Sequence, residues 1–178
     1  MLNEVSSRWS LTPEGWLQIL GEDASLLGND YQSNLLCRPA PTGEFQITVR
    51  VDAAPAENFQ QATLYLYQDG NNYIAINRGF CGPCLTSGSG VFMEYKIAGS
   101  WGAYNAKTDA TDTYLRLTSN GESISGYYAF APEEWQLFGK VGYFVQEAQV
   151  CLGVSNVDTA GINADLVGRF DYLDISLP

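Results

Sequence analysis

An Asn-Gly pair at positions 120 and 121 lies between two stretches in which apolar and polar residues alternate. Asn-Gly is typical of the two-residue turn that joins antiparallel strands, because both residues tolerate the positive backbone angles of a type I′ turn. This loop predicts the pairs Ser119–Glu122, Leu117–Ile124, Arg116–Ser125 and Tyr114–Tyr127. Alternation then gives the hairpin an apolar face with Leu115, Leu117, Ile124 and Gly126, and a polar, aromatic face with Tyr114, Arg116, Ser125 and Tyr127.

A second hairpin is predicted around Asp69-Gly70-Asn71. A three-residue loop there predicts the pairs Tyr67–Tyr73, Leu66–Ile74, Tyr65–Ala75 and Leu64–Ile76. A two-residue loop at Gly70-Asn71 would mix polar and apolar side chains on both faces, so it is rejected. The tyrosines of this hairpin are therefore expected to face away from the core.

Alternating segments recur from residues 16–20 to 170–177, and turns rich in Gly, Pro and Asn separate them. No window shows a sustained 3.6-residue apolar repeat. A chain of 178 residues suits one domain over residues 1–178. The pattern predicts an all-β protein that closes a barrel or stacks two sheets in order to bury its apolar faces.

The region 113–142 also resembles a known family. Its motif here reads Leu115-Arg116-Leu117, a short turn, Tyr127-Tyr128, Trp135 and Gly139, with further matches at 16–19, 61–67, 72–76 and 170–173. It resembles the concanavalin A-like module that follows the catalytic domain of many bacterial β-xylosidases and recurs in single-domain proteins. The resemblance implies a two-sheet antiparallel jelly-roll sandwich of the concanavalin A-like lectin/glucanase type.

The net charge of the chain is −11, from 20 acidic and 9 basic residues. Such a chain repels nucleic-acid phosphates and anionic membranes, so neutral partners are expected, with no nucleic acid and no membrane among them. No stretch approaches the length of a membrane span, and residues 1–5 do not resemble a signal peptide. Two compartments remain open: the cytoplasm, or the cell exterior as a module excised from a longer secreted chain.

The four cysteines form no convincing redox or zinc motif. Cys81-Gly82-Pro83-Cys84 copies the thioredoxin spacing, but no helix follows that would lower a thiolate pKa, so a local disulfide or free loop thiols are expected. Zinc is disfavoured because there is only one close pair and no histidine. Cys37 and Cys151 are predicted to be buried small side chains or a cross-strand disulfide.

Catalysis is not expected. The chain has no histidine, which removes the commonest general base and the Ser-His-Asp system. Glycosidases of this fold use paired carboxylates, but Glu133-Glu134 and Glu22-Asp23 fall in turns or after strands, and Glu94 stands alone. A small glycosidase is therefore the least favoured class.

Aromatic and planar polar side chains on a sheet face suit a sugar, because rings pack on its apolar face while polar groups bond its hydroxyls. We expect a non-catalytic carbohydrate-binding or ancillary module, whose ligand is a neutral glycan. The resemblance implies xylan-derived sugars as first candidates and an adjacent catalytic domain as a possible partner. The alternative is a structural module that packs against another domain and has no ligand of its own. The two hairpins are expected to place their tyrosines and Arg116 on one shared face. The predicted binding residues are Tyr65, Tyr67, Tyr73, Glu94, Trp101, Tyr114, Arg116 and Tyr127, with Lys96 and, in the same loop as Trp101, Tyr104 beside them.

A structural calcium ion is a further hypothesis, because related jelly-roll modules tie their chain ends together with one. Asp171 and Asp174, with Glu22 or Asp23, would supply the oxygen ligands that calcium prefers.

Overall fold

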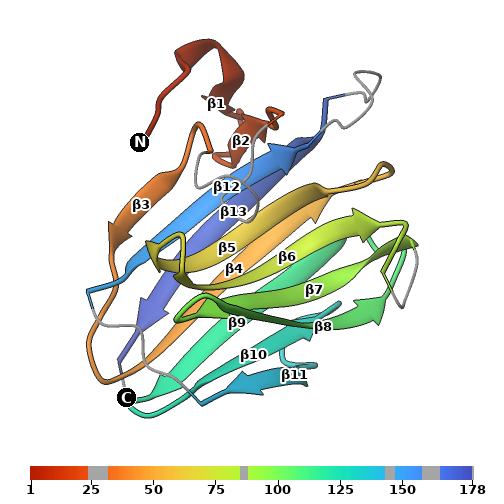
Figure 1. Cartoon of the computed structure of the whole chain (residues 1–178). Helices are drawn as coiled ribbons and strands as arrows, with labels where there is room; N and C mark the ends of the chain where they lie inside the picture. The colour runs from red at the N-terminus through yellow and green to blue at the C-terminus, as the bar shows by residue number, and fades with distance from the viewer. Residues whose placement is uncertain (24–31, 85–87, 143–146, 158–164, 178) are drawn as a thin grey trace.

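The protein is a sandwich of two antiparallel sheets (Figure 1). Its structure is a computed structural model that describes residues 1–23, 32–84, 88–142, 147–157 and 165–177. The six-stranded sheet, here called the front sheet, has the strand order β3 (Leu36–Pro39), β12 (Gln149–Asn156), β5 (Gln60–Asp69), β6 (Asn72–Cys81), β7 (Gly88–Ile97) and β8 (Ser100–Lys107). The seven-stranded back sheet has the order β1 (Trp9–Leu11), β2 (Leu17–Leu20), β13 (Val167–Ser176), β4 (Glu44–Ala53), β9 (Asp112–Asn120), β10 (Ile124–Ala129) and β11 (Gln136–Val141).

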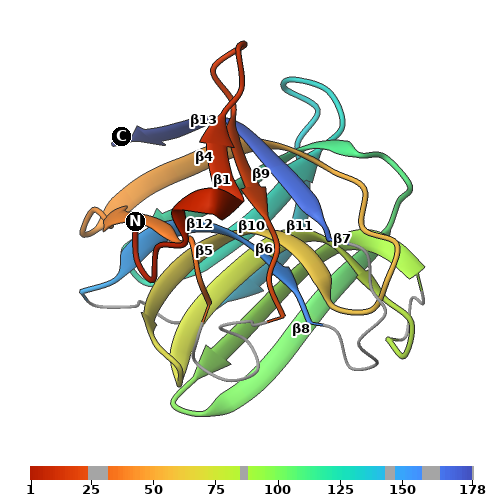
Figure 2. The ribbon, with the colours of Figure 1, turned by 90° about the horizontal axis from the view of Figure 1, so that it is seen from above.

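Figure 2 shows the two sheets as stacked layers, with β4, β9 and β13 in one and β5, β6 and β7 in the other. This arrangement confirms the predicted fold class. A short 3-10 helix, Ser6–Arg8, precedes β1. Among the described residues there is no helix long and apolar enough to cross a membrane.

Alternation of side chains fills the space between the layers. Along β4 and β9 every second residue points inward, so that Ile47, Val49, Leu115 and Leu117 are completely buried. The front sheet contributes the residues that meet them, including Leu64, Leu66, Ile74, Ile76 and Met93. Each such side chain stabilises the fold by about 1.5–3 kcal/mol relative to an exposed position. The period-two pattern thus fixes which side of every strand belongs to the core.

The hairpin between β5 and β6 has the predicted register. Tyr67 lies opposite Tyr73, Leu66 opposite Ile74, Tyr65 opposite Ala75, and Leu64 opposite Ile76. The hydrogen bond from the Asn71 amide to Asp69 Oδ1, at 2.7 Å, shapes the loop. The loop itself was predicted wrongly: Asp69 pairs with Asn72, so Gly70 and Asn71 form a two-residue loop, and a register shift between Tyr67 and Asp69 restores the predicted pairs.

The hairpin between β9 and β10 differs from its predicted register by two residues. Ser119 pairs with Ile124 rather than Glu122, and Arg116 pairs with Tyr127 rather than Ser125. Gly121, with a φ of 83°, takes the first loop position, while Asn120 Oδ1 accepts hydrogen bonds from the Glu122 and Ser123 amides. The asparagine therefore shapes the turn through its side chain instead of occupying its centre. A shift of two residues leaves each side chain on its predicted face, so the buried and exposed sets are unchanged.

One part of the strand prediction was wrong. Residues 100–104 were expected in a loop, but they belong to β8, which pairs along its length with β7. The sequence of β8 is rich in Gly, Ala and Asn, so its strand conformation depends on hydrogen bonds from β7. The alternation also predicts a strand over residues 141–145; β11 ends at Val141, and residues 143–146 lie outside the described part of the chain, so this range stays a prediction.

Arg78 is completely buried between the sheets at one end of the sandwich. Its guanidinium donates to the backbone carbonyls of Ala110, Gly79 and Gly90, at 2.6–3.0 Å, and to Ser89 Oγ at 2.6 Å. Burial lowers the pKa of Arg78. These four acceptors satisfy most of its donors, so the arginine closes the core without an ion pair.

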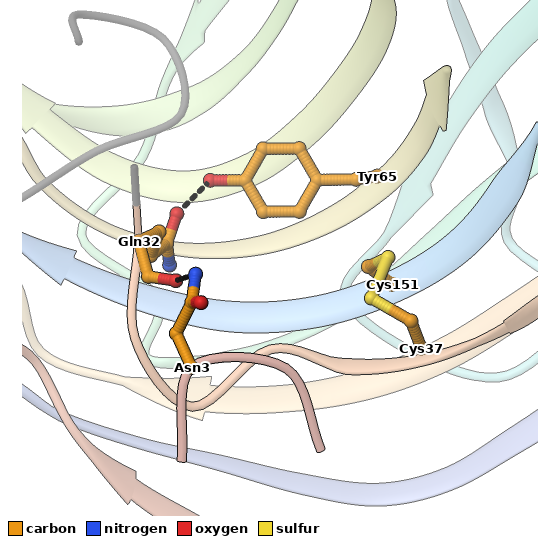
Figure 3. Close-up of a disulfide and its surroundings, with 5 residues drawn as sticks. All are labelled: Asn3, Gln32, Cys37, Tyr65 and Cys151. Carbon is orange, nitrogen blue, oxygen red and sulfur yellow. Dashed lines mark hydrogen bonds between the residues drawn. A yellow bond between two sulfur atoms is a disulfide. The ribbon is translucent and has the colours of Figure 1, made fainter. Parts of the chain in front are cut away.

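Both cysteine pairs form disulfides. Cys37 of β3 is bonded to Cys151 of β12, directly opposite it in the front sheet, and Cys81 is bonded to Cys84 at the end of β6. The segment 32–35 packs on the outer side of β12. A Cβ added at Gly153 of β12 would lie 2.6 Å from both Gln32, which Figure 3 shows, and Leu35. The outer side of the front sheet is therefore partly covered by the chain itself.

Candidate functional site

The predicted binding residues lie on two opposite surfaces. Tyr65, Tyr67, Tyr73, Glu94 and Trp101 belong to the outer face of the front sheet. By contrast, Tyr114, Arg116 and Tyr127 belong to the outer face of the back sheet. The prediction that these two groups share one face was wrong. Each hairpin points its polar side away from the core, but the hairpins belong to different sheets, so their polar sides point in opposite directions.

Two front-sheet tyrosines are buried and have no free ring face. Tyr65 is 0% exposed and Tyr73 is 1% exposed, and they form a second apolar cluster with Leu35, Ala75 and Cys151. The Tyr65 hydroxyl donates to Gln32 Oε1 at 2.8 Å (Figure 3). Burial raises the pKa of Tyr65, and the side chains of Thr63 and Gln32 partly oppose this rise. These two rings support the surface rather than form it.

Glu94 stands at the centre of the polar part of this face. Its Oε1 accepts a hydrogen bond from Gln61 Nε2 at 3.1 Å. Burial raises its pKa from 4.5 to about 7, while the side chains of Gln61 and Asn77 partly oppose this rise. Near neutral pH the group is therefore divided between acid and carboxylate, so it is able both to donate and to accept a hydrogen bond. A carboxyl with such a shifted pKa is a typical feature of a functional site.

More accessible groups lie beside this cluster. Tyr67, Lys96 and Trp101 lie in one row across β5 to β8 that also contains the buried Tyr73, and Trp101 is 65% exposed. In the next row the neighbours of Glu94 are Ala75 and Ala103, whose side chains are too short to cross over the carboxyl. We call Gln61, Tyr67, Asn77, Glu94, Lys96 and Trp101 the front-face cluster.

Tyr104 was predicted to stand beside Trp101 in a loop, but the two residues point to opposite sides of β8. The Tyr104 ring lies where a Cβ on Gly139 would clash at 2.4 Å, and its hydroxyl donates to the Lys140 carbonyl at 3.1 Å. Tyr104 thus bridges the edge of β8 to β11 and does not belong to the front-face cluster.

The outer face of the back sheet carries alternating arginine and aromatic side chains. The Arg50 guanidinium lies 5.0 Å from the Trp16 ring centre and 5.7 Å from that of Tyr114. Farther along, the Arg116 guanidinium lies 3.6 Å from the Trp135 ring centre, and Tyr114 meets Trp135 edge to face. We call these five residues the back-face ladder. Cation–π pairs of this kind are worth about 0.5–1 kcal/mol each at exposed sites.

The two arginines of the ladder have different partners. Arg50 makes a two-pronged ion pair with Asp112, at 3.0 and 2.7 Å, which raises its pKa, and it reaches Asp171 Oδ2 at 3.4 Å. Arg116 donates to Thr48 Oγ1 at 3.0 Å, and burial lowers its pKa. Tyr127, opposite Arg116 on β10, is half-buried.

Several residues of these surfaces were missed in the sequence. Gln61, Asn77, Trp16 and Arg50 each occupy an outward position in an alternating segment, so the period-two pattern contained a signal for them. Trp135 precedes β11 and reaches the ladder only because β10 and β11 pair. No local pattern marks that contact.

The predicted calcium ligands are placed apart from any cluster that could hold a metal. Asp171 is bound to Arg50, and Glu22 to Arg8 and to Ser33 Oγ. Within the described ranges, no three or more His, Cys, Asp or Glu side chains lie close enough to coordinate one ion. The donor set at Asp171 and Asp174 therefore does not fit calcium, which takes 6–8 oxygen ligands.

Solved structures with this fold include two glycoside hydrolases. The GH43 BlXynB protein from Bacillus licheniformis superimposes with a TM-score of 0.78 at 18% identity over 95% of this chain and 34% of that protein. A xylan β-1,4-xylosidase from Bacillus halodurans C-125 gives 0.77 at 16% identity, over 98% of this chain and 35% of that one. This chain thus spans about a third of these enzymes.

A functionally unknown protein from Saccharomyces cerevisiae has a TM-score of 0.76 at 13% identity, over 99% of this chain and 95% of its own. In that structure the fold accounts for nearly the whole chain. No curated protein matches the sequence at a significant level. The sequence model of the β-xylosidase C-terminal concanavalin A-like domain matches residues 1–175. The chain belongs to this family of β-xylosidase C-terminal domains.

Proposed function

We propose that this chain is a non-catalytic accessory module of glycoside hydrolysis that binds neutral, xylan-derived saccharides through its front-face cluster. The observation that carries the proposal is the position of Glu94 beside amide side chains on a sheet face edged by an exposed tryptophan. Membership of a family of non-catalytic domains in xylosidases supports the choice of sugar.

The chemistry of the cluster suits a sugar better than a charged ligand. Trp101 and Tyr67 offer ring surface for the apolar side of a pyranose, and Glu94 offers hydrogen bonds to its hydroxyl groups. Lys96 and an ionised Glu94 balance each other in charge, so no single sign dominates. A retaining or inverting glycosidase needs a second carboxyl about 5–10 Å from the first. Among the described outward positions of β5 to β8, Glu94 is the one carboxyl-bearing residue, so binding is the chemistry that the cluster supports.

Calorimetric titration of the whole chain with xylo-oligosaccharides tests the proposal. A stacking ring contributes on the order of 1 kcal/mol and a hydrogen bond a similar amount, so we expect dissociation constants of about 10 μM to 1 mM. Trp101→Ala should weaken binding about five- to tenfold, and Glu94→Gln several-fold. Arg116→Ala on the opposite sheet is the matched control and should bind like the wild type. Binding that survives both front-face substitutions would place the ligand elsewhere.

A second candidate function is domain packing without a ligand. The two Bacillus enzymes support it, because the region that matches this chain makes up about a third of each enzyme and is joined to about twice its length of other sequence. If arabinan, glucan, mannan and fructan oligosaccharides fail to bind at millimolar concentration, and xylan-derived ones fail as well, this second function becomes the better account.

A further inference from the structure

A cavity of about 410 Å³ lies on the far side of the molecule from the front-face cluster, between the β1–β2 turn and the outer face of the back sheet. Its walls include Pro13, Glu14, Trp16, Gln18, Asp52 and Arg169. We propose that this cavity is a second saccharide site, which binds one neutral sugar ring against Trp16. The choice of a saccharide rests on the proposed function, whereas the cavity and its groups do not.

Trp16 is held in place from two sides. In the turn, the Thr12 amide donates to the Trp16 carbonyl at 2.9 Å, and the Trp16 amide donates to Thr12 Oγ1 at 3.2 Å. On the sheet, the Arg50 guanidinium lies 5.0 Å from its ring centre and is itself bound by Asp112. A ring that is fixed before the ligand arrives loses little conformational entropy on binding. Trp16 thus has the rigidity of a stacking platform.

The polar groups of the cavity are ordered in the same way. Arg169 Nε donates to Gln18 Oε1 at 3.0 Å, and its Nη1 donates to Asp52 Oδ2 at 3.1 Å. The three residues lie side by side on β2, β13 and β4, so the sheet register sets their spacing. A guanidinium has five donors and a carboxylate accepts several hydrogen bonds, so these contacts use only part of their capacity.

The charge and size of the cavity favour a neutral ligand that bears hydroxyl groups. Glu14 and Asp52 outnumber Arg169, and hydrogen bonds to its backbone and to Thr12 lower the pKa of Glu14. Anionic ligands such as phosphates or uronates are disfavoured, while hydroxyl groups find both donors and acceptors. Ligand sites of this volume are common, at roughly 300–1,000 Å³. A neighbouring cavity shares Asp52 and Arg169, so a longer saccharide has room to extend.

The four tryptophans permit a direct test by NMR, because each indole N–H gives its own signal. Xylohexaose is titrated into the intact protein, and the signals are assigned with single Trp→Phe variants. We expect the Trp16 signal to shift with saturation, and the Trp9 signal, outside the cavity, to remain in place. Trp16→Ala should weaken this second binding event about five- to tenfold, and Gln18→Ala should weaken it less. A urea titration of each variant confirms that it is folded.

The outcomes separate this inference from the proposed function. Shifts at Trp101 alone would overturn the second site and leave the front-face cluster standing. Shifts at Trp16 alone would support the cavity and place the primary site there. If neither signal moves with any neutral oligosaccharide at millimolar concentration, the cavity is not a saccharide site.

Discussion

Polar side chains on the two outer faces of the sandwich have different environments. On the front face, polar groups are taken out of water: Tyr65 and Asn77 are fully buried, and burial shifts the Glu94 pKa to about 7. On the back face, Arg50 and Arg169 stay half exposed or exposed and are held by carboxylates and aromatic rings. The front face therefore depends on desolvation, whereas the back face depends on ion pairs and stacking. The comparison shows that the exposure and the bonding partners of an outward-facing polar residue depend on the segments that pack over it.

The largest expected effect concerns the disulfide that fastens the front face. Cys37 and Cys151 are 114 positions apart, so removing their bond frees a long loop in the unfolded chain. We expect Cys37→Ala/Cys151→Ala to lower the free energy of unfolding by about 4 kcal/mol, within the usual range for such loops. The matched control, Cys81→Ala/Cys84→Ala, opens a separation of only 3 and should cost about 2 kcal/mol or less. Urea unfolding under non-reducing conditions measures both. Equal losses would show that loop length does not govern their contributions.

The next largest expected effect is a pH-dependent contribution of Glu94 to the free energy of unfolding. Because its folded pKa is about 7, against 4.5 for a free carboxyl, the unfolded state releases this proton at a lower pH than the folded state. The contribution of the neutral group to stability is therefore full below pH 4.5 and is lost as pH rises to about 7. The loss is on the order of 3 kcal/mol at most. Glu94→Gln should remove this dependence, which urea midpoints at pH 5 and pH 8 would reveal.

A wild-type protein whose stability changes with pH in the same way as Glu94→Gln would contradict the buried carboxyl. Glu133→Gln, which alters an exposed carboxyl in a turn, is the control and should leave the pH dependence of the wild type intact.

A smaller effect is expected on the back face. Arg50→Ala removes the ion pair with Asp112 and the contacts with Trp16 and Tyr114, and it should cost about 1–2 kcal/mol at low salt. Because this pair is partly exposed, raising the salt concentration should shrink the difference between variant and wild type. Thermal or urea unfolding at two sodium chloride concentrations provides the measurement. A difference that is independent of salt would assign the effect to packing alone.

The smallest effect is expected at Arg116. It stacks on Trp135 and donates to Thr48, but among the described residues no carboxylate lies within ion-pair distance of it. Arg116→Ala should therefore cost about 1 kcal/mol or less, with little response to salt. Measuring it beside Arg50→Ala separates stacking from ion pairing. A salt response as large as that of Arg50→Ala would reveal a charged partner.

The contrast between the two hairpins shows which structural features can be predicted from local sequence. At residues 69–71 the strand pairs could be predicted, because this pairing keeps Leu66 and Ile74 on the same side, but the register shift that accommodates a two-residue loop could not. At Asn120 the turn type was misjudged, yet the faces were right, since a shift of two residues preserves the alternation. β8 could not be predicted, because its residues have weak strand propensity and take their conformation from β7.

For the strands that alternation revealed, the sequence by itself determined which side chains point inward, because a period of two requires only neighbouring residues. It also determined the family, through motifs made of core and turn residues. Only the tertiary structure decided which sheet each hairpin joins, and hence that Tyr65 and Tyr114 face opposite sides of the molecule. It likewise decided that Tyr65 is buried, through a contact with Gln32 from a segment 33 positions away. Such contacts depend on the packing of the whole chain, and no local period records them.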